Sequence, residues 1–386
     1  MDKTRHQDQE QQWEQEDQQF GETESREETD KFACPGCGAN MTFNPDTQTL
    51  YCQYCGKSID IKANGDIDEH DFYTANDNAK DWGKENRVIK CESCGAQTLL
   101  ETYSTAQFCA FCGSSHVVKV DESAGIPPQS LIPFKVSLNK ATELFKKWIK
   151  RRFFAPKAVK TDSQIKKISG VYIPCWTYDS NTFSNYVAEK GTYYYVTRTH
   201  WVTRNGKRER VVTRERRIRW RWVSGTYSRF FDDVLVNASK NADSKLMKKL
   251  EPFNMKELVP YDSKFLTGFL AERYSIGLDP GWEIAKQEIK AQIRQGVINQ
   301  INGDEVRNLK IDTRYSNITY KHILLPVWMA SYKYKDKIYR FMVNGQTGEV
   351  QGYSPVSPWK VVAVVVAVLA LLCIGLYLYS NSAPIY

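Results

Sequence analysis

Four C-x-x-C pairs constrain this chain more than any other feature. The second pair follows the first after 14 residues, and the same arrangement is repeated 57 positions later. A glycine follows every pair and allows the positive φ angle that a metal-binding knuckle needs. Two knuckles on facing hairpins present four thiolates to one metal ion, so the spacing predicts two four-thiolate sites. Their ligands are Cys34, Cys37, Cys52 and Cys55 in the first, and Cys91, Cys94, Cys109 and Cys112 in the second.

The cysteine pattern favours structural zinc. Each unit is too short to fold on its own core, so metal binding would supply its folding free energy. A closed four-thiolate site leaves no position for water and is therefore structural. The alternatives are a rubredoxin-like iron site and a redox C-x-x-C, which needs a βαβ context that the sequence lacks. We expect two zinc ribbons with two zinc ions, at residues 32–62 and 89–120, joined by a linker at 63–88.

An uncharged apolar run lies near the C-terminus, from Val361 to Tyr379. As a helix, 19 residues span about 28 Å, close to the roughly 30 Å hydrocarbon core of a bilayer. A buried core helix is the alternative, but such helices seldom lack a polar face over this length. Basic residues are abundant before the run and absent after it. The positive-inside rule then predicts a single-pass cell-membrane protein with a cytoplasmic N-terminus, a transmembrane helix at 357–380 and an external tail at 381–386. A cytoplasmic location also argues against disulfides.

Charge is distributed unevenly over the 386 residues. Residues 1–33 hold four basic and eleven acidic side chains, a net charge of −7, which leaves +15 for the rest of a chain whose total is +8. Few apolar groups interrupt this acidic segment, so burial cannot offset the entropy of ordering it. We expect residues 1–31 to be a disordered acidic tail.

Residues 121–356 have the length and apolar content of one α+β domain with a mainly antiparallel sheet. A helix from a Ser137 cap to about Phe153 carries an apolar stripe on one face and the basic residues Lys146, Lys147 and Lys150 on another. A second helix is predicted over Asp279–Ile301, with Asp279 as its cap and an inward apolar stripe of Trp282, Ala285, Ile289, Ile293 and Val297. The whole chain is thus expected to be multidomain, with two zinc ribbons, this domain and one C-terminal transmembrane helix.

A basic ribbon is predicted between Tyr193 and Val223, with its turn at Asn205-Gly206. From Lys190 to Arg221 there are eleven basic and two acidic residues. In the returning strand three arginines, Arg217, Arg219 and Arg221, alternate with Ile218, Trp220 and Trp222. This surface, and the lysines Lys146, Lys147 and Lys150, could bind an anionic ligand: nucleic acid, anionic lipid or an acidic protein. The alternative is an exposed basic strand face with its tryptophans packed inward.

Catalytic motifs are absent from the sequence. It contains no G-x-x-x-x-G-K-[ST] phosphate-binding loop, no H-E-x-x-H, no G-x-S-x-G and no set of kinase motifs. The five histidines are scattered. We therefore expect a protein that is not an enzyme.

The order of these parts resembles a family of bacterial membrane-anchored zinc-ribbon proteins of the transcription-factor-IIB type. Besides the C-x-x-C-G units, the resemblance rests on five segments: Leu131–Phe134, Gly170–Trp176, Tyr261–Tyr274, Leu325–Trp328 and Val343–Gly348. It implies a membrane adaptor. Some Gram-positive members act with SPFH-domain and phage-shock-protein-A-type proteins in membrane stress, and these are the protein partners that the resemblance implies.

Two functions remain open from the sequence. The first is a non-enzymatic, tail-anchored adaptor that recruits partner proteins to the membrane through its zinc ribbons and its α+β domain. The second is a membrane-tethered nucleic-acid-binding protein that uses the ribbons and the arginine-rich strands, whose binding would weaken steeply with salt.

Overall fold

The computed structural model of the chain describes most of the residues after Phe32. The described ranges are residues 32–62, 65–78, 87–92, 96–100, 109, 111, 117–120, 125–160, 165–204, 207–334 and 337–382. The predicted acidic tail at 1–31, the turn at Asn205-Gly206 and the two cysteines Cys94 and Cys112 lie outside them.

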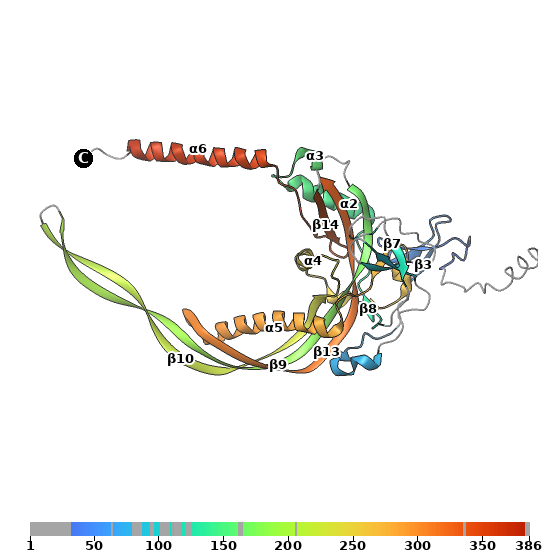
Figure 1. Ribbon diagram of the computed structural model, residues 1–386, viewed down its shortest axis with the longest axis horizontal. Helices are drawn as coiled ribbons and strands as arrows, with labels where there is room; N and C mark the ends of the chain where they lie inside the picture. The colour runs from blue at the N-terminus through green and yellow to red at the C-terminus, as the bar shows by residue number, and fades with distance from the viewer. Residues whose placement is uncertain are drawn as a thin grey trace, which may run out of the picture.

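Two very long antiparallel strands form the centre of the protein, β9 (Ile165–Arg204) and β13 (Glu305–Tyr334). They pair along most of the length of β13, and β10 (Lys207–Asn237) pairs with the other edge of β9. Figure 1 shows these three strands as one long curved layer, from which the β9–β10 hairpin continues past the end of β13.

Shorter strands complete a sheet of twelve strands around this centre. The pairs β12–β9 and β13–β8 are parallel, and the other pairs in the sheet are antiparallel. The prediction of an α+β domain is thus confirmed as a mixed, sheet-rich domain. Its remaining strands are β4 (His70–Asp71), β5 (Arg87–Cys91), β6 (Gln97–Leu100), β7 (Val117–Val120), β8 (Ser130–Leu131), β11 (Val259–Pro260), β12 (Leu270–Glu272), β14 (Lys337–Asn344) and β15 (Val350–Gly352).

Local bulges accompany the curvature of the long strands. The pairing register shifts between Phe231 and Val234 in β10 and at two places in the outer half of β13. Asp233, Asn308 and Asn317 lie at these shifts with φ angles of 50°, 51° and 51°. Asn and Asp tolerate the left-handed region better than other side chains, and a bulge bends its strand. Three short polar residues thus set where the sheet curves.

Helix α5 (Leu278–Ile301) packs against β9, β10 and β13 and lies beside their concave face (Figure 1). The predicted inward stripe is confirmed, because Trp282, Ala285, Ile289, Ile293 and Val297 are all buried. The predicted cap is wrong by two residues: Gly277 is the N-cap, and Asp279 lies in the first turn, where its charge favours the positive end of the helix dipole.

Helix α2 (Leu138–Arg151) covers the other end of the sheet and begins after the predicted cap, Ser137. Its buried stripe stacks on β14, where the rings of Phe145 and Phe341 lie 3.6 Å apart. The short helices are α3 (Lys157–Lys160), α4 (Ser244–Leu250), η1 (Phe72–Asn78), η3 (Met255–Glu257) and η4 (Ser263–Leu266).

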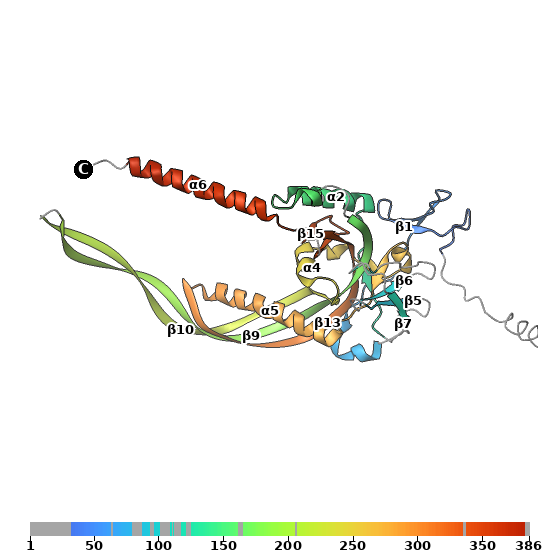
Figure 2. The same ribbon diagram turned by 45° about the horizontal axis from the view of Figure 1, so that its top comes forward.

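Helix α6 (Pro358–Ser382) contains the predicted apolar run. Its segment Pro358–Leu378 is long and apolar enough to span a membrane, and none of that segment is buried against the rest of the protein. The start of the helix is fixed to the loop between α2 and α3: the Ser357 amide donates to Phe154 O at 2.9 Å, and Lys360 Nζ donates to Ala155 O at 2.7 Å. Figures 1 and 2 show α6 leaving the domain in the same direction as the β9–β10 hairpin.

Candidate metal centre

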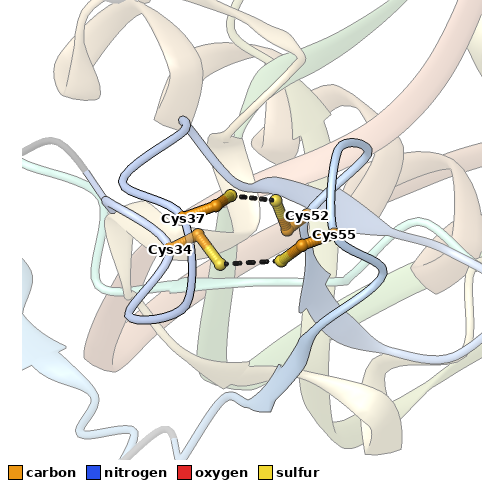
Figure 3. Close-up of side chains that lie close together, drawn as sticks. All are labelled: Cys34, Cys37, Cys52 and Cys55. Carbon is orange, nitrogen blue, oxygen red and sulfur yellow. Dashed lines mark hydrogen bonds between the residues drawn. The ribbon is translucent and has the colours of Figure 1, made fainter.

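The four cysteines of the first unit converge on one point. Their Sγ atoms all lie within 4.8 Å of one another, and Figure 3 shows the two pairs facing each other across the site. Cys34 Sγ is 3.3 Å from Cys55 Sγ, and Cys37 Sγ is 3.5 Å from Cys52 Sγ. In a tetrahedron with metal–sulfur bonds of about 2.3 Å the sulfurs lie about 3.8 Å apart. The cluster therefore fits tetrahedral coordination of one ion by four thiolates.

The backbone positions these sulfurs through two matching turns. Gly38 N donates to Cys34 O at 2.8 Å and Gly56 N donates to Cys52 O at 3.0 Å. Both glycines have positive φ angles, 75° and 74°, so the predicted role of the glycine after each pair is confirmed for the first unit. A side chain at either position would be strained.

The four neighbouring sulfurs of the first unit shift one another's pKa values. The amide of Gly36, 3.4 Å from Cys34 Sγ, lowers the pKa of Cys34 to about 6. The amide of Lys57 acts to lower the pKa of Cys55, but the sulfurs of Cys34 and Cys52 outweigh it and raise the pKa to about 12. Without a cation, negative charge on one sulfur disfavours ionisation of its neighbours.

The first unit is a small sheet docked on the main domain. Strands β1 (Thr42–Asn44), β2 (Thr49–Tyr51) and β3 (Ser58–Asp60) form a sheet of their own. Phe43 enters the domain core and contacts the ring of Phe265 at a centroid distance of 5.3 Å. Its amide donates to Thr267 O at 3.1 Å. Packing and a backbone hydrogen bond therefore hold the first unit on the domain.

The second cysteine unit is joined to the main sheet by strand pairing. Its strand β6 pairs with β12, and β5 pairs with β6 and β7. Cys91 and Cys109 are buried beside Phe111 in the core of the domain. The Cys91 amide donates to Ala96 O at 2.9 Å, which repeats the Cys34-to-Ala39 bond of the first unit at the same five-residue spacing. The second unit thus shares a turn with the first, while Cys94 and Cys112 are outside the described ranges.

The predicted basic residues lie in two separate places. Lys146, Lys147 and Lys150 belong to α2, which packs on β14 and β15, whereas Arg217, Arg219 and Arg221 belong to the outer half of β10. Figure 1 shows α2 at the opposite end of the protein from the tip of the hairpin. Trp222 is 62% exposed, so the tryptophans of this strand do not all pack inward. The three lysines and the three arginines therefore do not form one continuous basic surface.

A cluster of acidic residues that the sequence did not reveal surrounds Lys321. Carboxylate oxygens of Glu69, Asp179 and Asp232 lie within 4.8 Å of one another. Lys321 Nζ is 2.8 Å from Asp233 Oδ1 and 3.1 Å from Glu69 Oε1. Burial raises the pKa of Asp179 to about 7. Because Lys321 supplies the compensating charge, the cluster is an ion-pair network. Its members are up to 252 residues apart, so no local spacing could have indicated it.

Comparisons with known proteins give one informative match. The chain is 30% identical over 336 residues to the "Uncharacterized protein YdjG" of Bacillus subtilis (strain 168), an alignment that covers 86% of this chain and 92% of YdjG. No protein-family model matches the chain, and no solved structure matches it.

Proposed function

The chain belongs to the same protein family as YdjG of Bacillus subtilis, and we propose that it is a non-enzymatic adaptor that holds partner proteins at the cell membrane. The observation that carries this proposal is α6, an apolar helix of which no part of the spanning segment is buried in the protein. About 19 apolar residues exposed to water would be strongly unfavourable, and a bilayer removes that cost. The abundance of basic residues before α6 supports a cytoplasmic domain.

Two zinc ions belong to the same proposal, each held by four thiolates in a ribbon. The sulfur spacing of Cys34, Cys37, Cys52 and Cys55 supports the first. The shared turn at Cys91 supports the second, which Cys94, Cys109 and Cys112 would complete. Zinc favours closed tetrahedral sulfur sites and has no redox chemistry, so these ions would stabilise the ribbons. By the resemblance described above, the ribbons and the domain would recruit SPFH-domain and phage-shock-protein-A-type proteins in a response to membrane stress.

Variants of the first ribbon test the proposal. Purified full-length protein should contain about two zinc ions per chain, and Cys37→Ser should remove one of them, because three thiolates and a neutral hydroxyl bind zinc far more weakly. Partners cross-linked in native membranes and recovered with the full-length chain should be lost or reduced with this variant. Cys373→Ser is the matched control, since that cysteine is exposed in α6.

The outcomes separate the parts of this proposal. Iron or no metal in the purified protein would contradict the zinc sites. A set of partners unchanged by Cys37→Ser would contradict recruitment through the first ribbon.

A membrane-tethered nucleic-acid-binding protein is the second candidate, favoured by the arginines exposed on β10. This candidate requires that the affinity for nucleic acid fall steeply as the salt concentration rises. Changing Arg217, Arg219 and Arg221 to Gln should abolish the binding. Binding that is absent or independent of salt excludes this candidate.

A further inference from the structure

The outer part of the β9–β10 hairpin is a two-stranded ribbon without a third strand. Strand β13 begins at Glu305, opposite Gly191, so it pairs with β9 no further than that residue. Beyond it only β10 pairs with β9. We call residues 192–204 and 207–219 the arm. Figure 1 shows the arm extending away from the domain and from α5.

The register divides the arm into two faces, because directly paired residues of an antiparallel ribbon lie on the same side. On the first face four arginines alternate with aromatic and small side chains. Its pairs are Tyr193 with Ile218, Tyr195 with Arg216, Thr197 with Arg214, Thr199 with Val212, Trp201 with Arg210 and Thr203 with Arg208. This is the arginine–aromatic face. The predicted residues Arg217 and Arg219 lie on the second face, opposite Tyr194 and Thr192.

The two faces differ in how their charge is balanced. Both glutamates of the arm, Glu209 and Glu215, belong to the second face. Glu215 Oε2 is 3.2 Å from both Arg198 and Arg217, which are on the same face. No acidic residue of the arm lies on the arginine–aromatic face. At its inner end Glu305 of β13 accepts a hydrogen bond from Tyr193 Oη at 2.6 Å, so the positive charge available to an external anion is mainly that of Arg208, Arg210 and Arg214.

Aromatic rings hold two of the four arginines of this face in place. The guanidinium of Arg216 lies 4.4 Å from the ring centroid of Tyr193, and that of Arg214 lies 5.7 Å from the ring of Tyr195. A guanidinium over a ring keeps its N–H groups available and loses less side-chain freedom on binding. The face is well exposed: Trp201 is 64% and Tyr195 is 61% accessible to solvent.

This chemistry matches the interface of an anionic bilayer. A guanidinium binds phosphate oxygens in a bidentate manner. Tyr and Trp are the side chains that gather at the level of the headgroups, where one end of the ring meets acyl chains and the other meets water. Val212, 54% exposed between the arginines, adds an apolar contact.

The position of the arm favours lipid over nucleic acid. In both views the arm and α6 leave the domain in the same direction, and the tip of the arm reaches at least as far as α6 (Figures 1 and 2). A bilayer that contains α6 must then meet the arm. Because arginine side chains are costly in the hydrocarbon core, the arm must lie along the headgroup layer of this bilayer and not parallel to α6 as in Figures 1 and 2.

We propose that the arginine–aromatic face of the arm binds the anionic phospholipid headgroups of the bilayer that holds α6. This inference rests on the proposed anchoring by α6 and adds a second membrane contact far from the helix in the sequence. It would fix the orientation of the domain on the membrane through two contacts in place of one.

A photo-cross-linking experiment tests the proposal on the full-length chain in nanodiscs. The probe, p-benzoylphenylalanine, replaces Tyr195 on the arginine–aromatic face or, as the matched control, Tyr194 on the opposite face. Lipid adducts are measured by mass spectrometry. We expect lipid adducts at position 195 but few at 194. The yield at 195 should fall at least tenfold when phosphatidylglycerol is replaced by phosphatidylcholine, because each of the four arginines near an anionic surface contributes about fivefold in binding.

Charge variants complete the experiment. Changing Arg208, Arg210, Arg214 and Arg216 together to Gln should reduce the adduct at 195 as much as removing the anionic lipid does. Changing Arg198, Arg217 and Arg219 to Gln should have a much smaller effect. Equal labelling at 194 and 195, or labelling at 195 that is independent of anionic lipid, would overturn the proposal. Cross-linking of position 195 to an added DNA duplex in place of lipid would also overturn it, in favour of nucleic acid.

A third probe position separates this proposal from the anchoring. The same photoprobe in place of Val366, which is 59% exposed in α6, should label lipid in both kinds of nanodisc. Lipid adducts at 366 without adducts at 195 would leave the anchor standing and exclude the arm contact. Without adducts at 366 the proposed anchoring fails, and the arm contact fails with it.

Discussion

Glu272 is a carboxyl group enclosed by the main sheet at the point where the second cysteine unit joins it. The residue lies on β12 opposite Thr98 of β6 and is fully buried. Ser239 Oγ and Asn241 Nδ2 both donate to its Oε1 atom at 2.8 Å, while Oε2 has no hydrogen-bond partner among the described residues. Burial raises the pKa of Glu272 from 4.5 to about 7, and these two hydrogen bonds oppose the increase. The folded protein therefore favours the protonated acid below about pH 7.

Protonation of Glu272 makes the stability of the folded state depend on pH. Because the pKa is higher in the folded than in the unfolded state, the contribution of Glu272 is greatest below pH 4.5 and is lost as the pH rises to about 7. The loss is on the order of 3 kcal/mol. Glu272→Gln mimics the protonated acid and should make the protein more stable at pH 8 by a comparable amount, with little change at pH 4.5.

Urea unfolding of the full-length protein in detergent, followed by tryptophan fluorescence at several pH values, measures this difference between variant and wild type. Glu288→Gln serves as the control, because Glu288 is a partly exposed carboxylate paired with Lys248 at 2.5 Å. Curves for Glu272→Gln and wild type that stay parallel from pH 4.5 to 8 would show that the Glu272 carboxyl is ionised in the fold.

At the scale of elements, Phe43 is the buried aromatic residue through which the first ribbon packs on the domain. Phe43 projects from β1 and is 4% exposed, because it packs between Phe265 and Phe269. Gln48, with a φ angle of 57°, adds a hydrogen bond of 2.7 Å to Phe134 O. Cys34 and Cys52 belong to a different buried cluster from Phe43, and Ile61 packs against both clusters. We expect metal binding to survive the loss of docking.

Phe43→Ala should therefore detach the first ribbon from the domain while its metal ion stays bound. Truncating a buried phenylalanine to alanine lowers stability by about 3–5 kcal/mol. Here that loss mainly weakens the docking of the ribbon on the domain. We expect faster hydrogen exchange of the β1 amides, above all the residue 43 amide that donates to Thr267 O, with the metal content of the first site unchanged. Tyr54→Ala, at a tyrosine that is 83% exposed, should change neither quantity. Loss of metal in Phe43→Ala would show that docking and metal binding are one event.

Elements with a local periodic signal were predictable from the sequence. Each of these signals lies within one short segment: the apolar stripes of α2 and α5, the glycines of the first ribbon and the apolar run of α6. The extent of β9 was not predictable in this way. Its apolar segment Gly170–Asp179 and its basic segment 193–204 look like separate strands, yet they are one strand of 40 residues. What joins them is pairing with β10 and β13, whose residues are distant in the sequence.

The same limit applied to the basic surface. The alternation of Arg217, Arg219 and Arg221 in one strand is visible in the sequence, but the side chains that share their face belong to the partner strand. Only the register shows that Glu215 lies beside Arg198 and Arg217, and that Arg208, Arg210, Arg214 and Arg216 have no acidic neighbour on their face of the arm.

At the scale of the whole molecule, α6 is attached to the domain only at its beginning. The Ser357 amide and the Lys360 side chain bind carbonyls of the loop between α2 and α3, while none of the segment Pro358–Leu378 is buried against the rest of the described protein. The domain also has its own buried core, from Leu131 to Val350. Its folding should therefore not depend on the helix.

Removing residues 361–386 tests this independence while keeping Lys360 and its two bonds, of 2.9 Å to Phe153 O and 2.7 Å to Ala155 O. The truncated protein should be recovered without detergent, because its large unburied apolar surface is gone. Its Tm should stay within about 2 °C of the full-length protein in detergent, since surface changes away from packed groups shift stability by about 0.5 kcal/mol or less. Lys360→Ala in the truncated protein controls for the contact that remains. A fall in Tm of about 5 °C or more on truncation alone would mean that α6 packs on the domain, and its exposed apolar surface would then no longer argue for a bilayer.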